Sequence, residues 1–403
     1  MTMKLREVAA SNQKFAEIAA PNPVGVFIGG TSGLGEYTAY NFAKYAKSPK
    51  VYVVGRSAEA GAKVVAQIES INPEANAQFV TCDITLIKEV DKLCDTLLAN
   101  ESTINLLYLS AGFVSLKGFS PSSEGIDKKL AVNYYGRWRF VDRLIPLLQA
   151  AAQQDDVAAV SAATDGDYHP INARVISVLQ PGNEGPIELD NLGLTRKFSL
   201  ARANRQIIEF NSLAVMRFGR LYPDIGFVHA GPGFVKTGIA RNLPFWARLP
   251  SKFAMLFVNT VQNATERLYY VASAPRFRKG AYLVDGNHKS VKERAQKRGY
   301  LTEDLQEKVW QHSEDIFARA IRQNNSHSED CDNGFVSTEH TEVEEANYHY
   351  EVPPSEAFPG LNDHTPSRGI IQEFQEEVTS VPSAAEVKLP DVEVSEVGSS
   401  QNV

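Results

Sequence analysis

The chain has 403 residues, 43% of them hydrophobic, which is enough to bury the core of one large domain or two modest ones without cross-links. Its three cysteines form neither a CxxC pair nor a metal-ligand cluster, which argues against zinc and disulfides and fits a reducing compartment. Residues 323–403 contain 17 acidic and two basic residues, so residues 1–322 carry a net charge of +8, which suits a phosphate-bearing ligand or simply solvates helix faces.

The N-terminal residues 1–23 alternate charged and short apolar stretches, unlike a secretory signal, and we expect a short helical extension there. The most hydrophobic later stretch, Leu243 to Val261, contains Arg248, Lys252 and two prolines, which disfavours a membrane-spanning helix. We therefore expect a cytoplasmic protein.

The apolar run Val24 to Ile28 is followed by GGTSGLG and a helical stretch, Glu36 to Ala46, which predicts a strand, a glycine turn and a helix. Val51 to Val54 is the next expected strand, and Ala58 to Ser70 has helical spacing of its apolar residues. Together these segments form a βαβ unit.

The same alternation continues along the chain. Further strands are expected at Gln78–Thr81, Ile104–Leu109, Arg174–Val178 and Gly226–His229, and helices at Ile87–Leu98, Leu130–Leu148, Ser199–Phe218 and Leu301–Arg322. Strands separated by helices predict an α/β fold, a Rossmann-type doubly wound parallel sheet. We expect a single domain over residues 24–322 and, because few large apolar residues follow, a disordered acidic tail over residues 323–403.

Gly29, Gly33 and Gly35 lie between the first strand and the first helix of this unit. Glycine allows the backbone angles of the turn and the close approach of a pyrophosphate, which binds the free N–H groups at the helix N-terminus. The spacing in this strand-turn-helix context favours a dinucleotide site over a merely flexible turn.

Arg56 follows the second strand, where an enzyme specific for NAD carries an acidic residue for the ribose 2′-hydroxyl. A guanidinium there can bind a 2′-phosphate through two N–H groups, which favours NADP(H). The alternative is a solvated arginine at a strand end.

The chain resembles the short-chain dehydrogenase/reductase family in five sequence motifs, which follow one another in the order typical of that family. They are GGTSGLG, Cys82-Asp83-Ile84 after the third strand, Leu109-Ser110-Ala111-Gly112 after the fourth, VNYYG around Asn133, and Pro232-Gly233 after the sixth. The resemblance covers about Val24 to Arg322, and the longer segments, such as VYVVGRS and HAGPGFVKTGI, resemble a fungal branch associated with secondary metabolism.

The resemblance implies a set of cofactor-binding residues. They are Gly29, Thr31, Ser32, Gly33, Leu34, Gly35, Arg56, Asp83, Ala111, Gly112, Asn133, Arg202, Pro232, Gly233, Val235 and Thr237. Asp83 would accept from the adenine amino group, the Ala111-Gly112 backbone would pass the adenine ribose, and Pro232 to Thr237 would frame the nicotinamide. Ser110 departs from the asparagine usual in the family, but it still offers a donor and an acceptor.

The catalytic pattern of the family is incomplete. The resemblance implies a YxxxK pair that supplies a proton, and the corresponding residues here are Phe198 and Arg202. Phenylalanine has no proton to give, whereas Arg202 keeps a charge and donors for a ribose hydroxyl. Asn133 matches the family asparagine that kinks its helix and anchors a water-mediated relay. For the family serine the alignment offers Leu179 or Gln180, or, with a two-residue shift, Ser177. The predicted catalytic set is therefore Asn133, Ser177 and Arg202.

Other residue types could replace the missing proton donor. Tyr168, His169 and His229 are residue types with suitable pKa values, although a structural role is the favoured interpretation for each. Residues 238–258 occupy the place of the family's substrate lid, and their aromatic side chains suit an apolar pocket, helix packing or a membrane surface. We expect a hydrophobic small-molecule substrate, no metal and no nucleic-acid partner.

Three functions remain open from the sequence. The first is an NADP(H)-dependent oxidoreductase acting on a hydrophobic ketone or alcohol of polyketide or terpenoid type. The second is a catalytically degenerate scaffold or sensor that binds the cofactor, and the third is a lyase or isomerase on the same fold. The family resemblance also implies homo-oligomers that assemble through the two long helices.

Overall fold

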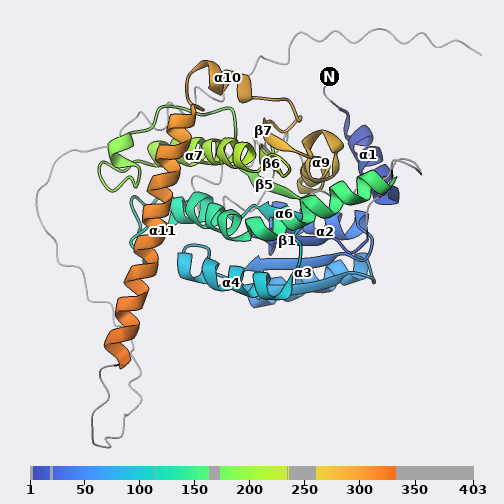
Figure 1. The fold of residues 1–403 in the computed structure, drawn as a ribbon, viewed down its shortest axis with the longest axis horizontal. Helices are drawn as coiled ribbons and strands as arrows, with labels where there is room; N and C mark the ends of the chain where they lie inside the picture. Colours follow the sequence, from blue (N-terminus) through green and yellow to red (C-terminus); the bar gives the residue numbers. More distant parts are fainter. Residues whose placement is uncertain are drawn as a thin grey trace, which may run out of the picture. The chain divides into compact units, whose positions relative to one another are not determined.

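A parallel seven-stranded sheet organises the part of the chain that the computed structural model describes, which comprises residues 3–18, 21–113, 115–162, 173–233, 235 and 260–332 (Figure 1). The strands lie in the order β3-β2-β1-β4-β5-β6-β7, and every neighbouring pair is parallel. Their bounds are β1 (Val24–Ile28), β2 (Lys50–Gly55), β3 (Asn76–Thr81), β4 (Leu106–Leu109), β5 (Arg174–Val178), β6 (Gly226–Ala230) and β7 (Gly280–Val284).

The central strands are buried along their whole length, whereas the two edge strands are partly exposed. All residues of β1, β4, β5 and β6 are buried, which explains why these strands are continuous apolar runs rather than alternating ones. The direction in which successive strands are added reverses between β1 and β4. In doubly wound sheets the ligand binds at such a point, outside the carboxyl ends of the strands.

Helices cover both faces of the sheet (Figure 1). One face packs on α4 (Ile87–Asn100), α6 (Gly136–Ala162) and α7 (Leu200–Leu221), and the other on α2 (Gly33–Tyr45), α3 (Ala58–Ile71) and α9 (Val261–Ser273). An outer helix, α1 (Leu5–Ile18), packs on α2 and α9, and α11 (Glu303–Asp332) lies across α4 and α7. The shorter elements are α5 (Lys128–Leu130), the π-helix η1 (Ala131–Tyr135), α10 (Lys292–Lys297) and two 3-10 turns, η2 (Leu189–Asn191) and η5 (Pro275–Phe277).

Aromatic and polar contacts fix α11 to the rest of the fold. Trp310 packs edge-on against Phe218 of α7, with ring centroids 4.9 Å apart. The hydroxyls of Ser313 and Tyr134 are hydrogen-bonded at 2.9 Å inside the same interface. The last predicted helix is therefore part of the core on this face of the sheet.

The Rossmann-type α/β fold predicted from the sequence is confirmed, with several differences in the elements, among them the helices α9 and α10, which were not predicted. The sequence pattern missed β7, a short strand that begins with glycine and is half-exposed at the sheet edge. The helix expected from Leu130 is interrupted by η1 and continues to Ala162, and α11 continues to Asp332, past its predicted end at Arg322. Residues 333–403 of the predicted tail lie outside the described residues.

Candidate nucleotide and catalytic site

The glycine turn packs against Ala111, just after the end of β4, and at Gly33 it faces open space. Gly29 has a φ of +87°, and a Cβ there would lie 2.5 Å from the backbone N of Ala111. A Cβ on Gly35 would lie 2.3 Å from the Gly29 carbonyl oxygen. Gly33 also has a positive φ, +63°, but a Cβ there would meet nothing within 4 Å. Two glycines thus serve close packing, and the third faces open space at the N-terminus of the following helix.

The N-terminus of α2 opens at this turn. Ser32 is its N-cap residue and makes no side-chain capping bond, and Thr31 lies against Gly55 at the end of β2. The Gly33 N–H donates to the Glu36 carboxylate at 3.1 Å, and Leu34 follows in the first turn. A carboxylate on this N–H group shows that the helix end attracts negative charge, as a pyrophosphate site requires.

Arg56 lies next to Gly55, and therefore beside the glycine turn. Its side chain is exposed, and it forms no hydrogen bond or ion pair within the described residues. No acidic residue flanks it in the sequence. The guanidinium is thus available for a phosphate on the ribose.

The chain after β3 and β4 supplies the next two predicted contacts. Asp83 is half-buried, and its Oδ1 accepts from the backbone N–H of Thr85 at 3.0 Å and from its hydroxyl at 2.9 Å. This turn starts the approach to α4, so Asp83 has a structural task beside the predicted adenine contact. The Ala111 N–H donates to Ile28 O at 2.9 Å, which holds the Ala111-Gly112 backbone next to β1.

The chain after β6 lies beside the loops that follow β5 and β7. Gly233 has a φ of +70° and approaches Gly286, while Gly231 packs on Pro181. Pro232 and half-buried Val235 belong to the same segment, and the predicted contact Thr237 lies outside the described residues. A hollow of about 490 Å³ opens nearby, lined by Pro181, Gly182, Asn183, Ser290, Val291, Glu293 and Arg294. This hollow is at the carboxyl edge of the sheet, where a substrate could meet the nicotinamide.

Asn133 lies in the π-helix η1, which fits the kinked helix implied for this residue. Its side-chain amide donates to Lys129 O at 2.9 Å, and its carbonyl oxygen Oδ1 lies 2.8 Å from the position of a Cβ on Gly112. Its backbone carbonyl accepts from Asn211 of α7 at 2.9 Å. The structure therefore brings Asn133 to the carboxyl end of β4, and its roles toward cofactor and catalysis stay predictions.

Ser177 is completely buried at the end of β5. Its hydroxyl donates to Asn211 Oδ1 at 2.8 Å and accepts from Arg137 Nη1 at 3.0 Å. Trp138 Nε1 also donates to Asn211 Oδ1, at 3.0 Å. These bonds favour a structural role for Ser177, and its catalytic role stays a prediction.

Phe198 and Arg202 stand just before α7 and in its first turn. Phe198 is half-buried against Phe119, and the Lys129 ammonium lies over its ring, 4.8 Å from the centroid. Arg202 is half-buried and pairs with Glu188 at 3.2 Å. The position of the family tyrosine thus lies beside a cation, whereas Arg202 is directed to a surface carboxylate.

Lys129 is a further residue near this position, and it was not among the predicted site residues. Its side chain is almost fully buried. Lys129 Nζ donates to Gly118 O at 2.8 Å and to Asp127 at 3.0 Å. Lys129 and Arg137 lie four residues before and after Asn133, a spacing that puts side chains on one side of a helix. This spacing is the signal that could have identified both residues.

Of the three candidate substitute donors, one is described by the structure. His229 is fully buried, its Nδ1 is hydrogen-bonded to the Ser212 hydroxyl at 2.8 Å, and burial lowers its pKa to about 3. A neutral imidazole enclosed in this way is a poor source of a proton for a substrate. Tyr168, His169 and the predicted lid at residues 238–258 lie outside the described residues.

Two further predictions concern cysteines and metals. Cys82 and Cys94 are buried free thiols, as expected, and burial raises the pKa of Cys82 to about 12. Among the described residues no cluster of three potential metal ligands occurs, and no helix is long and apolar enough to span a membrane.

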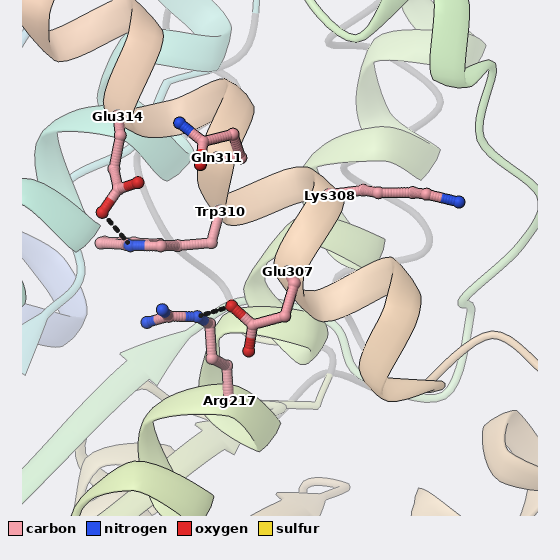
Figure 2. A pocket seen from close by; sticks show the side chains of 6 residues that line it. All are labelled: Arg217, Glu307, Lys308, Trp310, Gln311 and Glu314. Atoms are coloured by element: carbon pink, nitrogen blue, oxygen red, sulfur yellow. Dashed lines mark hydrogen bonds and ion pairs between the residues drawn. The ribbon is translucent and has the colours of Figure 1, made fainter.

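A second hollow, of about 330 Å³, lies between α7 and α11 (Figure 2). Its wall includes the ion pair of Arg217 with Glu307, at 2.9 Å, and Trp310, which donates to Glu314 at 2.9 Å. Arg217 belongs to the C-terminal part of α7, which leads into the start of β6. The hollow is therefore at the opposite edge of the sheet from the glycine turn.

Comparison with known proteins agrees with the geometry. The family model described as short chain dehydrogenase matches residues 24–170. An oxidoreductase of Emericella nidulans is 29% identical over 79% of this chain and 99% of its own, and oxidoreductase andH of Emericella variicolor is 34% identical over 63% and 70%. A short-chain dehydrogenase/reductase of Stachybotrys chartarum is 26% identical over 64% and 74%. A solved NADPH-bound carbonyl reductase from chicken fatty liver has a TM-score of 0.47 at 16% identity, covering 67% of this chain and 98% of that chain.

Proposed function

Because the chain belongs to the short-chain dehydrogenase/reductase family, we propose that it is an NADP(H)-dependent oxidoreductase that interconverts a ketone and an alcohol. The observation that carries the proposal is the glycine turn, in which Gly29 and Gly35 pack closely while Gly33 leaves open space at the N-terminus of α2. Bound there, the cofactor supplies the hydride that adds to the carbonyl carbon, and a proton on the oxygen completes the alcohol.

The preference for NADP(H) over NAD(H) rests on Arg56. An exposed guanidinium beside the turn, with no acidic neighbour, can bind a 2′-phosphate and has no acceptor to offer a free 2′-hydroxyl. The remaining contacts would come from Asp83, the Ala111-Gly112 backbone, Asn133 and the segment from Pro232. Arg202 already pairs with Glu188. Its predicted contact with the ribose therefore has the weakest support among the predicted cofactor contacts.

The substrate class is the less defined part of the proposal. Exposed Phe119 packs against the half-buried Phe198, and Leu116, three residues before Phe119, is also exposed, which gives this segment an apolar surface. Such a surface suits a hydrophobic substrate of polyketide or terpenoid type, and similarity to fungal oxidoreductases fits the proposed place in secondary metabolism. Homo-oligomers through α7 would have to use the part of its surface that α11 leaves uncovered.

A second candidate function is a scaffold that binds the cofactor without turnover. Its support is specific: Phe198 carries no hydroxyl, and Arg202 is paired with Glu188. In this case the glycine turn and Arg56 would keep their roles.

A titration separates these possibilities. Wild type and Arg56→Gln are titrated with NADPH and with NADH, following nicotinamide fluorescence and thermal shift, with Lys63→Gln as the control because Lys63 pairs with Glu59 on α3. We expect Arg56→Gln to weaken NADPH binding by about tenfold or more, with NADH binding unchanged. Binding of neither nucleotide by the wild type would refute the proposal, and NADPH binding without oxidation by any of a panel of apolar ketones would favour the scaffold.

A further inference from the structure

A buried cation lies under the carboxyl ends of β4 and β5. Arg137 of α6 is 1% exposed. Its Nη1 donates to Ser177 Oγ at 3.0 Å and to Val178 O at 2.9 Å, and its Nη2 donates to Ala111 O at 2.6 Å. All three acceptors are neutral, and all three belong to the ends of two neighbouring strands.

Within the part of the chain that the structure describes, the charge of Arg137 has no counter-ion. None of the ion pairs among the described residues includes it, and its Nε has no hydrogen-bond partner. Arg139, two residues further along α6, differs in this respect because it pairs with Asp91 at 2.6 Å and with Asp142 at 3.2 Å. Burial lowers the pKa of Arg137 to about 9, so the guanidinium still carries its charge at neutral pH.

This charge is close to the crevice in which the dinucleotide would lie. Ala111, whose carbonyl accepts from Arg137, packs directly on Gly29 of the glycine turn. Gly112, the next residue, is exposed, and a Cβ on it would lie 3.6 Å from Arg137 Nη2. A single backbone layer therefore separates the guanidinium from the edge of the sheet at which ligands bind in this fold. Its contacts with Ser177 and Val178 place it at the end of β5, next to β6, after which the predicted nicotinamide contacts follow.

We propose that Arg137 makes the site prefer the reduced over the oxidised dinucleotide, and thereby sets the enzyme for carbonyl reduction rather than alcohol oxidation. NADPH and NADP⁺ carry the same phosphates and differ by one positive charge on the nicotinamide ring. An unpaired buried cation disfavours that added charge, and it favours the negative charge that develops on a carbonyl oxygen as hydride arrives. The inference rests on the proposed NADP(H) function and goes further by naming a direction.

The test measures the dissociation constants of NADPH and NADP⁺, and needs no substrate. The variants are Arg137→Gln, which keeps N–H donors without charge, Arg137→Lys, which keeps the charge, and Arg139→Gln as the control on the same helix. We expect wild type, Arg137→Lys and Arg139→Gln to bind NADPH about tenfold more tightly than NADP⁺, and Arg137→Gln to lose most of that ratio.

Equal affinity of the wild type for the two forms would overturn the inference even if Arg137→Gln did not fold. So would an unchanged ratio in folded Arg137→Gln, or a ratio lost equally in Arg139→Gln. Binding of neither form by the wild type would instead refute the proposed function, and the inference with it.

Discussion

Replacing Gly33 by alanine should separate nucleotide binding from folding. The residue has a φ of +63°, so alanine costs roughly 1–2 kcal/mol of the free energy of unfolding. It adds no clash, because the new Cβ meets nothing within 4 Å. The same methyl group projects into the space beside the N-terminus of α2, where a pyrophosphate has to approach the backbone closely. We therefore expect a variant that folds, melts a few degrees lower and binds NADPH at least about tenfold more weakly.

Gly280→Ala is the matched control for this prediction. Gly280 has a φ of +89°, and a Cβ there also meets nothing within 4 Å, but it begins β7 at the sheet edge opposite the turn. The two variants should lose comparable stability, and Gly280→Ala should keep wild-type affinity. The assay compares melting temperatures with and without saturating NADPH, since ligand at 100 times Kd adds about 2.7 kcal/mol. Wild-type affinity in Gly33→Ala, or equal weakening in the control, would refute the reasoning.

Three other predictions concern groups around the crevice. Phe198→Tyr should place a phenol beside the Lys129 ammonium, so that an ultraviolet titration finds its pKa below about 10 and any NADPH-dependent ketone reduction rises by about 10². Ser177→Ala should lower the free energy of unfolding by about 1–3 kcal/mol, measured in urea, and leave NADPH affinity unchanged if the serine is structural. Glu209 is buried near Glu184, and burial raises its pKa to about 9. Folding therefore takes up a proton, and the free energy of unfolding falls as pH rises from about 4.5 to 9. Glu209→Gln should flatten that loss between pH 7 and 9. This window lies above the pH range in which the buried His229 titrates.

The sequence predicts the part of the site that depends on local backbone. The glycine spacing predicts the turn because its backbone conformation depends on residues that are near in the chain. The glycines are Gly29, Gly33 and Gly35, and a strand and a helix flank them. The strands buried on both faces are equally readable, since each is one apolar run. The partly exposed edge strand β7 lacks such a run, which is why the pattern missed it.

The electrostatics of the site could not be predicted in the same way. In the sequence, only the four-residue spacing from Asn133 marks Arg137, and its meaning comes from acceptors after β4 and on β5 that lie 26 and 41 residues away. Ser177 likewise reads as a candidate catalytic serine until Asn211 and Arg137 are seen to use its hydroxyl. Which charges are unpaired depends on contacts between elements, and no periodicity in one element encodes them.

Lys129 and Arg137 change what the loss of the tyrosine hydroxyl means. A reductase needs a positive electrostatic field that stabilises negative charge on the substrate oxygen, and it needs a proton that neutralises this oxygen and completes the alcohol. Arg137 is a buried cation with no counter-ion among the described residues, whereas the charge of Lys129 is paired with Asp127, so the first requirement can be met by Arg137 without Phe198 or Arg202. The missing phenol then limits proton delivery alone, a contribution of about 10² to 10⁴ in rate, which leaves hydride transfer feasible.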